Sequence, residues 1–171
     1  MERVVSTVDE IAAANGLYRQ DCRNVGWLHD LAKEEPVSAF QDLLDQGEIR
    51  LDPETLEQPN LWHGFHAAYW GSTRFGISDA DLLEAIRYHP TGSPEFSPTG
   101  LALIVADYCE PGRPLENTAG ICEQAKTDLF GAALRVAREK VKFVLEKGKE
   151  PHSRSLAFVD WLEKQTAEVR N

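Results

Sequence analysis

Apolar residues recur at three- and four-residue spacing along most of this 171-residue chain. The first segment shows the pattern, because Val4, Val8 and Ile11 fall on one helical face and Asn15-Gly16 then supplies a stop. No stretch alternates polar and apolar residues for long enough to require a strand. The chain is long enough for one hydrophobic core and too short for two comfortable ones. We therefore expect an all-α fold in which residues 1–171 form a single helical domain.

The same periodicity predicts further helices, separated by turns rich in glycine, proline and acidic residues. The expected helices span 3–14, 20–32, 37–46, 61–75, 78–88, 101–109, 118–147 and 153–169. Ser78 is the expected N-cap of the helix 78–88, and residues 49–59, with two prolines, are expected to form a loop. The four tryptophans are interpreted as core aromatics: Trp27, Trp62, Trp70 and Trp161.

Charge and composition exclude several classes of function. The formal net charge of −10 argues against a nucleic-acid binder, which needs clustered lysine and arginine. No apolar run approaches the roughly 20 residues of a membrane span, and the N-terminal residues lack a signal-peptide pattern. The cysteines Cys22, Cys109 and Cys122 are few and widely spaced, which is typical of reduced thiols. A cytoplasmic location is expected, with no nucleic-acid or membrane partner.

Five residues of metal-ligand type lie at helix ends or on apolar helix faces: His29, Asp30, His63, His89 and Asp107. An unpaired charge in such surroundings is costly, and a divalent cation removes that cost. Each residue also has an ordinary explanation, such as a hydrogen-bonded pair at His29-Asp30, helix capping at the other histidines, or a hydrogen bond between helices at Asp107. Mixed nitrogen and oxygen ligands suit iron, manganese, zinc or cobalt. Their joint occurrence favours a metal centre.

Four segments of the chain carry a family resemblance, in the family's order. They are Leu28-His29-Asp30-Leu31-Ala32-Lys33, Leu61-Trp62-His63-Gly64, Ala85-Ile86-Arg87-Tyr88-His89-Pro90-Thr91-Gly92 and Ala106-Asp107-Tyr108-Cys109-Glu110-Pro111-Gly112-Arg113. In these segments the chain resembles the YqeK-type HD-domain proteins, the symmetrical diadenosine tetraphosphate hydrolases of bacteria. The first segment is common to all HD domains, whereas the last two are more specific to this family. The likeness extends from about Val4 to the last expected helix.

The resemblance implies a helical HD domain that holds two metals, iron first, with manganese, cobalt or zinc as alternatives. Asp30 would bridge the metals, His29 and Asp107 would complete one site, and His63 and His89 would bind the other. Asp30 and Asp107 are the residues expected to carry catalysis. Two adjacent cations can activate a water and stabilise the entering and leaving oxygens of a phosphoryl group. In the family, the substrate is cut into two molecules of ADP.

The chain departs from the family pattern in its first helix, where the family has a further histidine. No histidine precedes His29 here, and the family position would fall at or just before Met1. We expect the natural gene to encode upstream residues that include this histidine. The alternative is that this member has lost one ligand, with reduced or absent catalysis.

Four residues in the resembling segments are expected to contact the phosphates of the substrate: Lys33, Thr91, Gly92 and Arg113. Their alternatives are a solvated charge for the two basic residues and a simple turn for Thr91-Gly92. Gly64 beside His63 leaves room for close approach. His66 is expected near the ligands or at the surface, and His152 in a loop.

Two other functional readings stay open. The chain could be another HD-domain nucleotide phosphohydrolase, with a similar metal centre and a different pocket. It could also be a non-catalytic nucleotide-binding regulatory protein that lacks the first metal ligand. A homodimer is compatible with either. A purely structural helical bundle is disfavoured by the polar residues placed in apolar helices.

Overall fold

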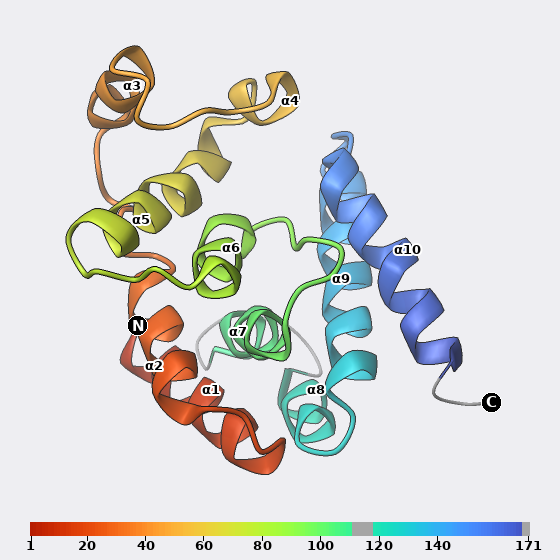
Figure 1. Ribbon diagram of the computed structural model, residues 1–171. Coiled ribbons are helices and arrows are strands. Elements are labelled where there is room, and N and C mark those ends of the chain that lie inside the picture. Colours follow the sequence, from red (N-terminus) through yellow and green to blue (C-terminus); the bar gives the residue numbers. More distant parts are fainter. Residues whose placement is uncertain (111–117, 169–171) are drawn as a thin grey trace.

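The computed structural model describes residues 1–110 and 118–168, and within these ranges it contains helices and turns but no strand (Figure 1). The elements are α1 (Glu2–Ala14), α2 (Arg19–Leu28), α3 (Val37–Asp45), α4 (Pro53–Leu56), the 3₁₀ helix η1 (Pro59–Leu61), α5 (Trp62–Thr73), α6 (Ala80–Tyr88), α7 (Pro98–Tyr108), α8 (Thr118–Ala125), α9 (Leu129–Glu146) and α10 (Ser153–Glu168). The all-α expectation is confirmed. No helix in the described part of the chain is long and apolar enough to cross a membrane.

Helix α7 is the centre of the fold, and Figure 1 shows it end-on with the other helices around it. Every residue from Gly100 to Tyr108 is buried, because the segment is apolar on all sides and helices pack on all of them. Its N-cap is Ser97, whose side chain accepts a hydrogen bond from the Gly100 N–H. The helix therefore starts three residues before the expected Leu101. It carries Asp107, 5% exposed, into the core.

A second, smaller apolar cluster joins α3 to α5 on one flank of the domain. Phe40 of α3 stacks on Trp62 of α5 with ring centroids 4.9 Å apart, and Ile49 and Phe65 complete the cluster. The Trp62 indole N–H donates to the Thr55 carbonyl, which anchors α4 to the start of α5. The expected loop 49–59 thus contains α4, which Asp52 caps through the Thr55 N–H.

Three local predictions for α2 and α6 were wrong. The N-cap of α6 is Asp79 and not Ser78, because the Asp79 carboxylate accepts from the Asp81 and Leu82 N–H groups. Helix α2 ends at Leu28, so His29 follows it and Asp30 lies in the next turn. Trp27 is 45% exposed, because α2 turns a different face toward α1 and α7.

The long helix predicted for 118–147 is divided into α8 and α9. Asp128 begins the second helix, since its carboxylate accepts from the Gly131 N–H at 2.9 Å. Apolar residues keep helical spacing on both sides of this break, so periodicity alone does not reveal it. The break matters because α9 does not continue in the direction of α8.

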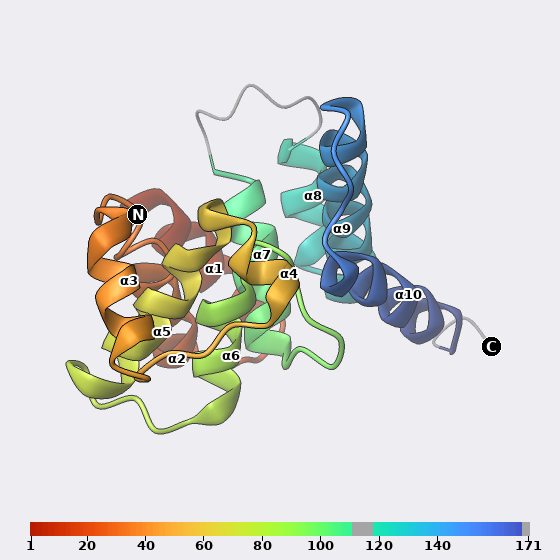
Figure 2. The same cartoon turned by 90° about the horizontal axis from the view of Figure 1, so that it is seen from above.

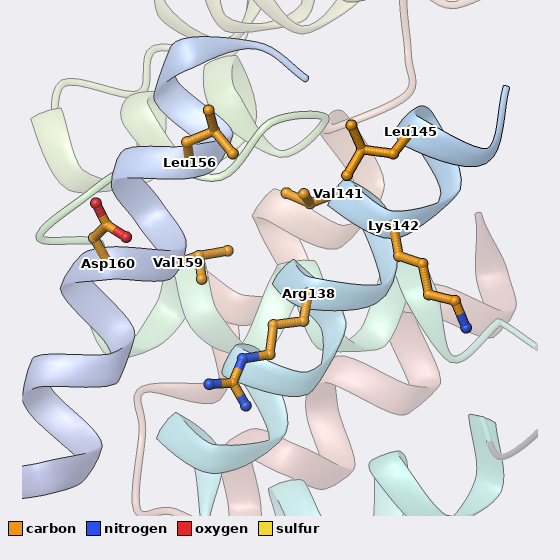
Figure 3. Close-up of a pocket in the computed structure, with 7 residues that line it drawn as sticks. All are labelled: Arg138, Val141, Lys142, Leu145, Leu156, Val159 and Asp160. Atoms are coloured by element: carbon orange, nitrogen blue, oxygen red, sulfur yellow. The ribbon is translucent and has the colours of Figure 1, made fainter. Parts of the chain in front are cut away.

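Helices α9 and α10 pack against each other on the flank opposite α3 and α4 (Figures 1 and 2). Figure 3 shows Leu156 and Val159 of α10 pointing toward Val141 of α9 across a small crevice of about 220 Å³. Arg138 and Asp160 lie at its edge. This apolar contact holds α9 in place as one wall of the larger cavity described below.

Gly92 provides a sharp test of the core packing. It adopts a φ of +77°, and a Cβ at this position would overlap the Phe158 ring of α10. We expect Gly92→Ala to lower the free energy of unfolding by roughly 2–4 kcal/mol, because it adds overpacking to left-handed backbone strain. The matched control is Gly76→Ala, at φ +68° with no neighbour within 4 Å, which should cost only about 1–2 kcal/mol. Chemical denaturation would compare them, and equal losses would contradict the packing argument.

Candidate metal centre

The five predicted metal ligands converge on one place in the fold. His29 and Asp30 follow α2, His63 is the second residue of α5, His89 follows α6, and Asp107 lies near the end of α7. His29, His89 and Asp107 are buried, and the side chains of Asp30 and His63 are 19% and 15% exposed. Four helices that are dispersed in the sequence thus bring their ends together here.

The three histidines are oriented in the same way. Each Nδ1 donates to the backbone carbonyl three residues earlier: His29 to Gly26 at 2.8 Å, His63 to Asn60 at 2.9 Å and His89 to Ile86 at 2.8 Å. A carbonyl oxygen can only accept, so the neutral rings carry their proton on Nδ1 and a lone pair on Nε2. The hydrogen bond from Nδ1 sets the tautomer and the orientation that a metal-binding imidazole needs.

The Asp30 carboxylate lies between these Nε2 atoms. Its Oδ1 is 3.3 Å from His63 Nε2 and 3.4 Å from His89 Nε2, and its Oδ2 is 3.6 Å from His29 Nε2. His29 Nε2 is also 3.7 Å from Asp107 Oδ1. The ligand-type atoms form two groups that share Asp30, namely Asp30 with His63 and His89, and Asp30 with His29 and Asp107.

The donor set fits a divalent cation. Asp30 Oδ1 is buried and makes no hydrogen bond, although His63 Nε2 and His89 Nε2 lie close to it and within 3.1 Å of each other. Lone pairs that face one another at these distances repel, and a buried acceptor without a donor is costly. A cation held by these atoms removes both penalties. The nitrogen and carboxylate ligands suit iron, manganese, cobalt or zinc.

The candidate centre lies in the wall of a cavity with a volume of about 640 Å³. Asp30, His63, His89 and Asp107 line it, and α9 supplies much of the remaining wall. A cavity of this size accommodates a drug-sized ligand. The metal ligands therefore face a space large enough for much of a nucleotide.

Only some of the predicted phosphate-binding residues are found on the cavity lining. Lys33 and Thr91 line the cavity, and the Lys33 ammonium is 2.7 Å from Asp30 Oδ2. The Thr91 hydroxyl donates to the Gly92 carbonyl at 2.9 Å. Gly92 is buried against Phe158 and is not part of the lining, so its evident role is packing. Arg113 lies outside the described residues.

The cavity residues that the sequence reasoning missed include Lys140 and Phe143 of α9. Their only sequence signal is a basic, amphipathic helix, which is common on protein surfaces. The loop histidine His152 is also buried at this cavity, and its Nε2 is 3.0 Å from the Thr55 hydroxyl. His66 is buried against Trp70, with ring centroids 4.4 Å apart, and belongs to neither ligand group around Asp30.

The chain is similar to characterised proteins over most of its length. A symmetrical bis(5′-nucleosyl)-tetraphosphatase of Halalkalibacterium halodurans is 33% identical over 159 residues, which cover 93% of this chain and 84% of that protein. The chain belongs to the symmetrical bis(5′-nucleosyl)-tetraphosphatase family. The family's enzyme from Bacillus subtilis is 28% identical over 161 residues, covering 93% of this chain and 85% of that protein. No protein-family model matches the chain.

A solved structure supports the HD hydrolase fold of this tetraphosphatase-family chain. A predicted HD superfamily hydrolase involved in NAD metabolism from Clostridium acetobutylicum superposes with a TM-score of 0.87 at 28% identity. The superposition covers 95% of this chain and 86% of that one. The HD hydrolase fold and the two ligand groups together support a divalent metal in this member of the family.

The electrostatics of this tetraphosphatase-family site keep its ligands ready for a cation. Burial would raise the pKa of Asp30, but the favourable contacts of its carboxylate, among them the Lys33 ammonium 2.7 Å from Oδ2, outweigh it and hold that pKa well below its ordinary value. Burial lowers the pKa of His89 to about 4, against the opposing influence of the Asp30 carboxylate. At neutral pH, Asp30 is therefore ionised and His89 is neutral, which are the forms that coordinate metals.

The shifted pKa of His89 predicts a pH dependence of stability. Its folded pKa of about 4 lies below the ordinary value of 6.5, so between these values the unfolded chain binds more protons. In chelator-treated protein, acidification from about pH 6.5 to 4 should lower the free energy of unfolding by up to about 3 kcal/mol from His89. Denaturation at several pH values measures this. The slope should flatten in His89→Gln, and an identical slope in the variant would contradict the assignment.

Proposed function

We propose that this chain is a metal-dependent hydrolase of nucleotide polyphosphates that cleaves diadenosine tetraphosphate symmetrically into two ADP. The observation that carries the proposal is the arrangement of three Nε2 atoms and Asp107 around Asp30, in the wall of a cavity of about 640 Å³. The relatives from Halalkalibacterium halodurans and Bacillus subtilis, named symmetrical bis(5′-nucleosyl)-tetraphosphatases, support the choice of substrate.

The proposed metal is iron, with manganese, cobalt or zinc as alternatives. Asp30 would bridge two sites, with His29 and Asp107 at one and His63 and His89 at the other. When bound, such a metal pair supplies an activated water and neutralises charge on the phosphoryl group. The backbone bonds from each Nδ1 hold the rings in place, so the geometry does not have to be assembled during the reaction.

Lys33 is the residue best placed to add a positive charge at the rim of the centre. Its side chain is 49% exposed, lines the cavity and contacts Asp30 Oδ2. The formal charge of the chain is −10, so a polyphosphate needs local cations to approach. Thr91 would have to exchange its hydrogen bond to Gly92 before its hydroxyl could donate to a phosphate. A contact from Arg113 remains a prediction from the sequence.

The test begins with elemental analysis of protein purified without chelator. The metal-loaded protein is then incubated with diadenosine tetraphosphate, and the products are separated by chromatography. Two ADP per substrate are expected, because symmetrical cleavage breaks the bond between the two central phosphates. AMP plus ATP would overturn symmetrical cleavage. Turnover confined to other nucleotides in a parallel panel would favour a different HD phosphohydrolase, and nucleotide binding without turnover would favour a regulatory protein.

A further inference from the structure

Helix α9 forms a wall of the cavity that carries none of the candidate metal ligands. Its contribution runs from Glu139 to Glu146, and it is set against the rest of the domain by α7 and α10. Two residues on this wall, Lys140 and Phe143, are separated by three positions and therefore lie on one face of the helix. Phe143 is placed roughly 4.5 Å further along the helix axis than Lys140.

Lys140 links this wall to the metal centre. Its ammonium donates to the His89 backbone carbonyl at 2.9 Å, and the same side chain lines the cavity. The His89 ring in turn lies 3.4 Å from Asp30 through Nε2. A positive charge is thus held directly beside the residues that would bind the metal. Phosphates next to a metal would lie within reach of this charge.

Phe143 gives the same wall an exposed aromatic ring. Phe143 is 55% exposed although it lines the cavity, and the Lys147 ammonium lies 5.3 Å from the centroid of its ring. The cavity lining also includes the apolar residues Leu61, Val144 and Pro151, together with charged residues of α9 such as Lys142 and Glu146. The cavity thus has the ligand-type side chains and Lys140 on its lining together with an exposed aromatic ring on α9, which matches a molecule with phosphates at one end and a planar base at the other.

We propose that α9 is the nucleoside-recognition wall of this site, with Phe143 stacking on the base and Lys140 binding the phosphate chain. The proposal rests on the proposed function in taking a nucleotide as the ligand. Stacking suits Phe143 because every base presents an aromatic face to a ring. The contributions of Phe143 and Lys140 to binding can be separated, since a ligand without a base can use only Lys140.

The experiment measures equilibrium binding of ADP and of pyrophosphate to manganese-loaded protein. Phe143→Ala should weaken ADP binding about tenfold and leave pyrophosphate binding unchanged. Phe143→Tyr should retain ADP binding, because it keeps the ring. The matched control is Phe75→Ala, because Phe75 is 57% exposed but lies outside the cavity lining, and this change should alter neither affinity.

Lys140→Met should weaken the binding of ADP and of pyrophosphate by about tenfold each. Lys140→Arg should retain most of the affinity because it keeps the charge. Metal content and thermal unfolding of each variant identify any general damage to the site. The matched control is Lys164→Met, an exposed lysine on α10.

The outcomes separate this inference from the proposed function. The base-stacking wall is overturned if Phe143→Ala binds ADP as tightly as the wild type does, or if it loses equal affinity for ADP and for pyrophosphate. This holds even if diadenosine tetraphosphate is hydrolysed. Unchanged affinities in Lys140→Met overturn the phosphate contact. Ring-dependent ADP binding without hydrolysis of diadenosine tetraphosphate supports the wall and overturns the proposed function alone.

Discussion

Replacing Asp30 with alanine should remove the bound metal and lower turnover of diadenosine tetraphosphate by about a thousandfold or more. The reason is that Asp30 is common to both ligand groups, with its oxygens 3.3–3.6 Å from the Nε2 atoms of all three histidines. Loss of any other ligand would leave one group intact, whereas loss of Asp30 disrupts both. Elemental analysis after dialysis gives the metal content, and product formation gives the turnover.

The matched control is His66→Asn, which removes a buried histidine from the same helix as His63. His66 packs on Trp70 and is absent from the ligand groups, so its replacement should lower stability and leave metal content near the wild-type level. If Asp30→Ala retained metal as well as His66→Asn does, Asp30 would not be the shared ligand.

Substitution of Gly64 by alanine should have the second large effect, on both stability and metal affinity. A Cβ on Gly64 would overlap the Arg87 carbonyl, so α5 and α6 could no longer approach as closely. These helices carry His63 and His89, whose Nε2 atoms lie 3.1 Å apart. We expect a loss of roughly 2–3 kcal/mol in the free energy of unfolding. A displaced ligand should also cost about 10- to 100-fold in metal affinity.

The control for this substitution is Gly120→Ala in α8, where a Cβ meets nothing within 4 Å. Alanine favours a helix by up to about 1 kcal/mol over glycine, so this variant should be as stable as the wild type or slightly more stable. Metal titration and chemical denaturation of both variants test the comparison. Unchanged metal affinity in Gly64→Ala would mean that the α5–α6 contact does not position the histidines.

Much of the candidate site was predictable because its signals are local. A histidine or aspartate in an apolar helix, or directly after one, has an ordinary explanation when taken singly, but the joint occurrence of five such residues within segments that resemble one family marked His29, Asp30, His63, His89 and Asp107. The close approach at Gly64 was also predicted from the sequence and is confirmed, since the Arg87 carbonyl occupies the space a side chain would need. The all-α class followed from periodicity over many residues, which single local exceptions do not disturb.

Local features governed by a single hydrogen bond were predicted less well. Asp79 rather than Ser78 caps α6, and Asp128 starts α9 within a stretch whose apolar spacing is continuous. Either residue type can cap a helix, so composition does not choose between neighbours. The exposed Trp27 was missed for a related reason, because the side of α2 that packs is decided by the helices around it.

The sequence by itself determined that the chain forms amphipathic helices and that five ligand-type residues stand at their ends or on their apolar faces. These properties depend on spacings of three or four residues and on the cost of isolated polar groups in apolar surroundings. Only the tertiary structure decided that Asp30 lies between three Nε2 atoms, that Gly92 serves packing against Phe158, and that α9 brings Lys140 to the centre. Those relations join residues far apart in the chain, and they arise from how α2, α5, α6, α7 and α9 pack, which no local spacing encodes.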